Sequence, residues 1–146
     1  MAQFGRPSAD TTIGAWEDEL GGTADIFNSI NETSPNDSDF ITSEFAPSSS
    51  PYVTKLTSLT DPVLSTGHTV RYRARKDPSA GSQIDLVVEL RQGYVSEGSP
   101  GTLIATDTQV DLPTSFTTFA FALSGGEADS ITDYTDLYLR FVADQP

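Results

Sequence analysis

The chain has 146 residues, with 21 acidic against 8 basic side chains and a formal net charge of −13. Hydrophobic residues make up 36% and aromatic residues 10%, which is enough apolar area for one buried core and too much for a disordered acidic polymer. The chain has no cysteine and one histidine, which excludes disulfides, thiolate chemistry and any site of several histidines within one chain. The acidic charge repels nucleic acid and anionic membranes, so we expect neither as a partner.

We expect a single domain over residues 1–146, with residues 1–12 forming an extended arm. No run of ~18 apolar residues is present that could span a membrane. The N-terminal residues also lack the basic and apolar segments of a secretory signal peptide. The sequence therefore predicts a soluble protein.

Turn-forming residues break the chain at short intervals, and the runs between them alternate apolar and polar residues with a period of two. β-Branched and aromatic residues dominate these runs, which is typical of strands with one buried face. The sequence predicts weaker strands at residues 11–16, 26–30 and 40–42, and clearer strands at residues 52–56, 69–76, 84–91, 103–108, 116–123 and 137–143.

The two clearest runs, residues 69–76 and 84–91, are separated by a polar loop, which predicts that they form a hairpin. Symmetric pairing about that loop sets Arg75 opposite Asp85 and Arg71 opposite Glu89 on the solvent side. Each exposed pair contributes only ~0.2–1 kcal/mol, so the apolar side chains on the inner face must supply most of the stability.

One helical turn is expected at residues 124–131, where Ser124 and Glu127 have the spacing of a capping box. The strand count suits a core closed between two sheets. The fold prediction is therefore an all-β, jelly-roll-like β-sandwich of about eight antiparallel strands with at most one short helical turn.

Basic residues gather on one predicted strand. Arg71, Arg73, Arg75 and Lys76 are half of all the basic residues and lie within six positions. We select these four as candidate contacts to an acidic partner, since a basic stripe on an acidic protein attracts opposite charge. A solvated strand face, balanced by acidic residues of the facing strand, is the simpler interpretation, and both remain open.

Acidic residues occur in close pairs, as general acid–base or glycosidase chemistry requires. Turn-forming sequence surrounds each pair, so we interpret them as residues that cap backbone N–H groups. A calcium site formed by oxygen ligands of residues 31–39 is the alternative, although this segment lacks the spacing of an EF-hand. We predict no catalytic residue, no cofactor and no metal ligand, and calcium is the one ion left to test. The pairs are Asp37 with Asp39, Glu127 with Asp129, and Asp133 with Asp136.

Two isolated side chains could carry a function by residue type alone. His68 could act as a general base only with a nucleophile that the sequence does not nominate, so we predict that it satisfies backbone groups in a turn. Trp16 could stack on a sugar, but its strand-like setting predicts a ring that seals the edge of the core.

Three segments of the chain carry a recognisable pattern. They are Arg6-Pro7-x-x-Asp10-x-x-x-Gly14-x-Trp16, then Leu59-x-Asp61-Pro62 with Ser65-Thr66-Gly67-His68-Thr69-Val70-Arg71-Tyr72-Arg73, and Ala128-Asp129-x-Ile131-Thr132-Asp133-Tyr134-x-Asp136-Leu137. With these segments the chain resembles, over nearly its whole length, a β-sandwich domain of structural proteins of tailed bacteriophages. That domain occurs both as small capsid decoration or cement proteins and as modules of larger particle proteins.

The resemblance implies a non-enzymatic capsid decoration protein, made in the host cytoplasm and bound at the capsid surface of the virion. Its expected partners are the major capsid protein or another virion protein, and further copies of itself. The resemblance carries no catalytic residues. The alternative function is a carbohydrate- or ligand-binding sandwich of a phage tail or fibre, and a two-carboxylate glycosidase comes third.

Overall fold

The computed structural model describes residues 2–146, which are mainly β with antiparallel sheets. The prediction of an antiparallel β protein is confirmed at this level. The strands are β1 (Pro7–Thr12), β2 (Glu17–Asp18), β3 (Ile41–Thr42), β4 (Ser50–Leu56), β5 (Thr69–Ala74), β6 (Asp85–Gln92), β7 (Thr102–Gln109), β8 (Thr117–Ala122) and β9 (Leu137–Asp144). The helices are the 3-10 helix η1 (Ile26–Ile30) and the short α-helix α1 (Gly125–Asp129).

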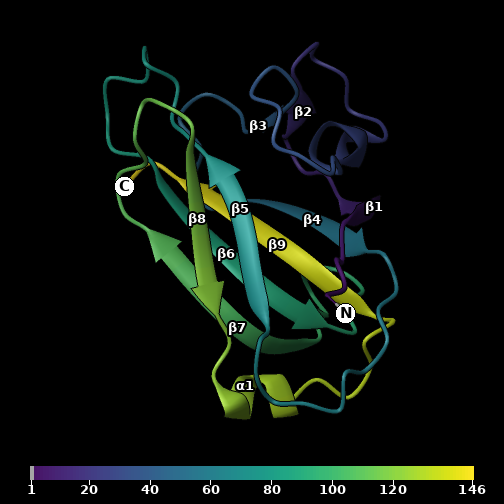
Figure 1. The fold of residues 1–146 in the computed structure, drawn as a ribbon. Helices are drawn as coiled ribbons and strands as arrows, with labels where there is room; N and C mark the ends of the chain where they lie inside the picture. The colour runs from purple at the N-terminus through teal and green to yellow at the C-terminus, as the bar shows by residue number, and fades with distance from the viewer. Residues whose placement is uncertain (1) are drawn as a thin grey trace.

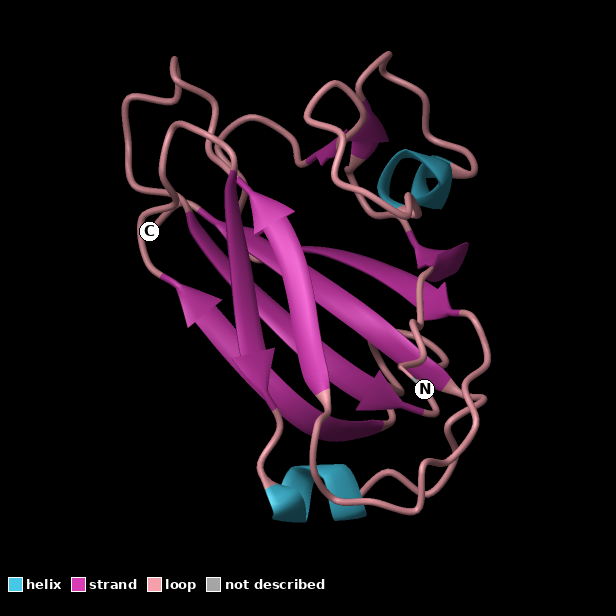
Figure 2. Cartoon of the chain, viewed as in Figure 1, coloured by secondary structure: helices cyan, strands magenta, loops and turns pink. Residues whose placement is uncertain are grey.

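Five strands form one sheet in the order β1-β4-β9-β6-β7, and β5 and β8 form a separate pair. The β5–β8 pair crosses over one face of the five-stranded sheet (Figure 1). The short β2–β3 pair and η1 lie at one end of the molecule, and α1 lies at the other (Figures 1 and 2). None of the helices in residues 2–146 is long and apolar enough to cross a membrane.

The core lies between the five-stranded sheet and the β5–β8 pair. Alternate residues of β6 are buried, as the sequence predicts, and Val88 at the strand centre is fully buried. From the other layer, Tyr72 of β5 stacks on Phe119 of β8 with ring centroids 5.4 Å apart, and both pack against the same cluster. Burial of each such large apolar side chain contributes ~1.5–3 kcal/mol, so this inner layer supplies most of the stability.

The predicted hairpin between residues 69–76 and 84–91 is wrong. β5 pairs with β8, placing Arg71 opposite Ala120, whereas β6 pairs with β7 and β9, placing Glu89 opposite Thr106 and Arg140. The loop between β5 and β6 therefore passes from one layer to the other. Period-two alternation fits any antiparallel partner, and exposed charge pairs are too weak to select one, so inward packing of aromatic side chains decides the pairing.

The prediction of a strand at residues 26–30 is also wrong, because this segment forms the 3-10 helix η1. The residues described therefore hold two short helical segments, η1 and α1, where at most one helical turn was expected. The Asp10 carboxylate accepts the backbone N–H groups of Ile26 and Phe27, at 2.8 and 2.9 Å, and so fixes the first turn. Such capping satisfies N–H groups that a helix start leaves without partners. The predicted helical turn at residues 124–131 is confirmed as α1, with the capping box between Ser124 and Glu127 formed in both directions.

The N-terminal strand begins earlier than predicted and ends at Thr12 instead of Trp16. β1 pairs with β4, so residues 7–12 are part of the sheet, and Met1 of the predicted arm lies outside the described residues. Gly14, with φ of +60°, takes the chain out of the sheet. A Cβ atom there would lie 2.6 Å from the carbonyl oxygen of Pro51, so the close approach of the two segments needs glycine.

Candidate partner-binding interface

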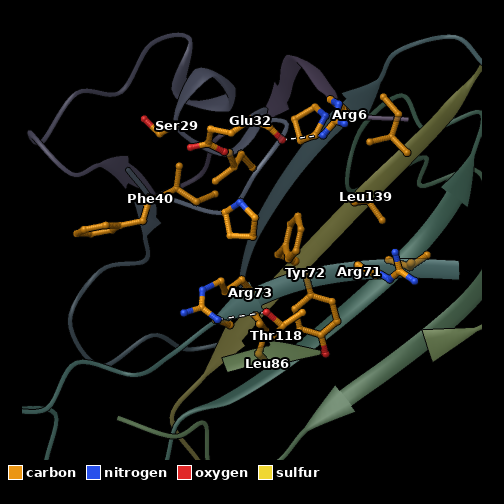
Figure 3. A pocket seen from close by; sticks show the side chains of 18 of the residues that line it. Arg6, Ser29, Glu32, Phe40, Arg71, Tyr72, Arg73, Leu86, Thr118 and Leu139 are labelled. Carbon is orange, nitrogen blue, oxygen red and sulfur yellow. Dashed lines mark hydrogen bonds between the residues drawn. The ribbon is translucent and has the colours of Figure 1, made fainter. Parts of the chain in front are cut away.

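The four basic residues selected from the sequence lie on β5 and just after it. β5 exposes Arg71 and Arg73 on its outer surface and buries Val70 and Tyr72 on its inner one, as the alternation predicts. Figure 3 shows Arg71, Tyr72 and Arg73 on this strand. No acidic residue lies opposite Arg71 or Arg73 on the paired strand, because β8 places Ala120 and Thr118 there.

Two of these cations are neutralised from distant segments. Arg73 donates from Nε and Nη2 to the two carboxylate oxygens of Asp37, at 2.5 and 2.7 Å. This bidentate contact holds the pKa of Asp37 below its usual value. Lys76 contacts Asp111 and donates to the carbonyl oxygen of Ser82. Asp37, a member of a predicted carboxylate pair, is thus the counterion of the stripe, which spacing alone could not reveal.

The other two cations have no carboxylate partner within residues 2–146. The guanidinium of Arg75 lies 4.8 Å from the ring centroid of Phe116, a cation–π contact. The side chain of Arg71 is exposed and forms no ion pair with any described residue. Arg71 and Arg75 are therefore free to bind an acidic group of a partner, whereas an acidic group can bind Arg73 only by displacing the Asp37 carboxylate.

A cavity of about 1350 Å³ lies beside β5. Figure 3 looks into it: Glu32 and Phe40 come from the segment between η1 and β3, Tyr72 from β5, and Leu139 from β9 of the five-stranded sheet. Its volume exceeds the ~300–1,000 Å³ of a typical small-molecule pocket. The lining combines apolar side chains such as Leu56 and Leu139 with charged residues of both signs, among them Glu32 and the arginines of β5. Apolar groups of a ligand therefore suit the cavity itself, whereas an acidic group would have to face the arginines of β5.

Glu32 lines this cavity, whereas the sequence analysis considered it only within the calcium alternative at residues 31–39. One of its carboxylate oxygens is buried without a hydrogen-bond partner, and burial, together with nearby Asp39 and Glu19, raises its pKa. Even so, residues 2–146 hold no group of three or more acidic or histidine side chains suited to a metal ion. The calcium alternative at residues 31–39 therefore gains no ligand cluster from the fold.

Among the remaining candidate carboxylates, Glu127 and Asp133 stabilise a cap and a turn. Glu127 accepts the backbone N–H of Ser124 at 2.7 Å, and Asp133 accepts that of Thr135 at 2.9 Å. These hydrogen bonds lower the pKa of both carboxyl groups, since they favour the charged form. Asp136 accepts the hydroxyl of Tyr138 at 2.9 Å. Glu127 and Asp133 therefore act as the capping residues that the sequence analysis favoured, whereas Asp37 and Asp136 bind other side chains.

His68 and Trp16 both belong to the scaffold. The indole of Trp16 is 7% exposed and donates to the carbonyl oxygen of Ser50, which confirms the predicted core position. A buried ring cannot serve as a stacking platform for a sugar. His68 shares a 2.8 Å hydrogen bond between its Nε2 and the Tyr134 hydroxyl, so its partner is a side chain and not the predicted backbone groups.

A scan against protein-family models, a search of curated proteins and a search of solved structures found no match to this chain.

Proposed function

We propose that the chain is a non-enzymatic structural protein of a tailed-phage particle: a capsid decoration protein that binds the major capsid protein and further copies of itself. It is made in the host cytoplasm and acts at the capsid surface. One observation carries the proposal. The residues that give the sequence its resemblance to phage particle proteins are, in this structure, residues that hold the scaffold together.

The N-terminal segment of the resemblance illustrates this. Asp10 accepts three hydrogen bonds, from the backbone N–H groups of Ile26 and Phe27 and from the Tyr52 hydroxyl. Gly14 supplies the left-handed turn against the backbone, and Trp16 fills the core edge. These contacts attach the β2–η1–β3 region to the sheet. A shared scaffold without a shared reactive site is what a family of building blocks would have in common.

The middle and C-terminal segments of the resemblance also hold parts of the scaffold together. His68 meets Tyr134 through a hydrogen bond, with the two rings 5.8 Å apart. The carbonyl oxygen of Tyr134 accepts the backbone N–H of Leu59. These contacts join the chain before β5 to the chain before β9.

We further propose that the architecture is a reduced jelly-roll-like sandwich. In chain order, β4, β6, β7 and β9 belong to the five-stranded sheet, while β5 and β8 belong to the facing pair. The connections β4–β5, β5–β6, β7–β8 and β8–β9 therefore pass between layers. Repeated crossing between two facing layers is typical of Greek-key and jelly-roll sandwiches.

The surface charge also supports a high-copy shell component. The net charge is −13, and five of the eight basic side chains already contact a carboxylate of the same chain. The surface therefore carries a net negative charge, which keeps neighbouring particles apart in solution. Within the basic stripe, Arg71 and Arg75 remain available to attract an acidic partner.

The test uses particles of the tailed phage that encodes the chain. We expect quantitative mass spectrometry of purified particles to find the chain in fixed stoichiometry with the major capsid protein. Particles from a gene-deletion strain should bind the added protein saturably and lose one surface feature in electron density. Absence from particles, or a few copies confined to the tail, contradicts the decoration role. Selective binding on a glycan array favours the carbohydrate-binding alternative instead.

A further inference from the structure

β5 has one open edge. The backbone N–H of Leu123 donates to the carbonyl oxygen of His68 at 2.9 Å, and hydrogen-bonded pairs alternate along an antiparallel ladder. The pairs Val70–Phe121 and Tyr72–Phe119 therefore carry the ladder bonds between β5 and β8. The backbone groups of Arg71 and Arg73 point to the opposite edge, where residues 2–146 place no further strand.

This open edge adjoins the cavity described above. A strand added beside β5 would turn alternate side chains inward, toward the cavity floor formed by residues such as Leu56 and Leu139. Its other side chains would lie on the outer surface, level with Arg71 and Arg73. The fold thus prescribes an alternating pattern for the occupant, with apolar residues inward and acidic residues outward.

Charge favours an acidic occupant at this position. Arg71 and Arg75 contact no carboxylate within the described residues, although the chain carries 21 acidic residues. Arg73 is held by Asp37, whose side chain is 48% exposed and belongs to the loop after η1. The Asp37 carboxylate thus binds the Arg73 guanidinium where an acidic group of a ligand would bind, and a ligand carboxylate can displace it.

We propose that the open edge of β5 binds an extended segment of a partner protein as an added β-strand, with acidic residues facing Arg71, Arg73 and Arg75 and apolar residues filling the cavity. Backbone hydrogen bonds to Arg71 and Arg73 supply binding free energy, and the alternating side chains supply selectivity. This inference deepens the proposed function by naming the surface and chemistry of the shell contact.

The experiment uses a fluorescent nine-residue peptide with Glu at alternate positions and Val or Leu between them. Three matched peptides serve as controls. One carries Lys in place of Glu, and the other two carry N-methyl groups on alternate backbone amides, one on the odd-numbered positions and one on the even-numbered positions. Fluorescence anisotropy measures affinity, and amide hydrogen exchange followed by NMR locates the contact. We expect slower exchange at the amides of Arg71 and Arg73, no binding of the Lys form, and loss of binding for only one N-methyl set.

Variants of the protein test the same surface. Arg71→Pro removes an N–H that the ladder with β8 does not use, and we expect about tenfold weaker binding. Arg71→Gln should weaken binding by about two- to fivefold, and Asp37→Asn, which releases Arg73, should strengthen it by a similar factor. Lys55→Gln is the matched control, because it removes one charge on the strand β4 and should leave the affinity unchanged.

The proposal is overturned if no acidic peptide binds, if the Lys form binds equally, or if both N-methyl sets behave alike. Peptide binding by wild-type protein keeps the test valid even if Arg71→Pro fails to fold. If the wild-type protein forms a dimer and Arg71→Pro abolishes it, then a second copy of the chain occupies the open edge. That result would also overturn the proposal of a partner protein. Particle binding separates the two proposals: particles that still bind Arg71→Pro refute the edge site alone, whereas peptide binding without particle binding refutes the decoration role alone.

Discussion

Replacement of Asp10 tests whether this side chain ties the β2–η1–β3 region to the sheet. Its carboxylate accepts the backbone N–H of Ile26 at 2.8 Å, that of Phe27 at 2.9 Å and the hydroxyl of Tyr52 at 2.8 Å. Ile26 is 1% exposed and Tyr52 is fully buried, so water cannot readily replace the lost acceptor. Burial and the neighbouring carboxylate also raise the pKa of Tyr52, which keeps its hydroxyl protonated as the donor.

The expected loss follows from these three hydrogen bonds. A buried donor left without an acceptor costs ~1–3 kcal/mol, so Asp10→Ala should lower the free energy of unfolding by about 3–5 kcal/mol. Asp10→Asn keeps the shape but offers one acceptor oxygen, and should cost ~1–2 kcal/mol. At ~2–4 °C per kcal/mol for a domain of this size, Asp10→Ala should melt roughly 10 °C lower.

Urea unfolding gives the measurement. Trp16 is the one tryptophan of the chain, and its ring lies 5.9 Å from that of Tyr52, so its fluorescence reports on this region. Asp25→Asn is the matched control, because Asp25 precedes η1 but makes no side-chain cap. Its unfolding free energy should stay within ~0.5 kcal/mol of the wild-type value. A loss below ~1 kcal/mol for Asp10→Ala would refute the assigned role, and a double-mutant cycle with Tyr52→Phe should give a clear coupling energy.

Three further predictions concern the scaffold. In the same urea assay, Gly14→Ala should lower the free energy of unfolding by ~1–3 kcal/mol, because Gly14 has a positive φ and a nearby carbonyl oxygen. The control Gly126→Ala lies in α1 with open space around it, so it should be neutral or stabilising by up to ~1 kcal/mol. The pKa of the Glu127 carboxyl, measured by NMR, should lie below 4.5 and should return toward that value in Ser124→Ala. Because the folded pKa is lowered, the stabilising effect of this carboxylate is present above pH 4.5 and is lost as the pH falls through the folded pKa. An unshifted titration would contradict the capping box. All five tyrosines have raised pKa values, chiefly through burial, so the protein should lose stability as the pH rises above 10, and ultraviolet titration should show tyrosine ionisation coinciding with unfolding and not preceding it.

Local patterns in the sequence were enough to identify most elements of this protein. The alternation in residues 84–91 and 137–143 predicts β6 and β9, and the spacing of Ser124 and Glu127 predicts α1, because each pattern is decided within one element. Partner choice is a different matter. Whether β5 pairs with β6 or β8 depends on how the whole inner layer packs, and charges worth fractions of a kcal/mol do not reveal it.

The candidate site shows the same division. The basic stripe was visible in the sequence, as was its place on the outer surface of a strand. The neutralisation of Arg73 by Asp37, from a segment 36 positions away, was not. The predicted cross-strand partner of Arg71, Glu89, lies in the other layer between Arg91 and Arg140. Such contacts are fixed by tertiary structure, so only the fold could distinguish a free arginine from a paired one.

The position of β9 has a consequence for biogenesis. This strand is synthesised after β4 and β6, yet it lies between them and pairs with both. Until it emerges, β4 and β6 have no common partner, and the unpaired edges of both strands are open to association with other nascent chains. The sheet therefore assembles after synthesis of this strand, and chaperone protection during translation should matter more for the yield of this protein than the speed of its final collapse.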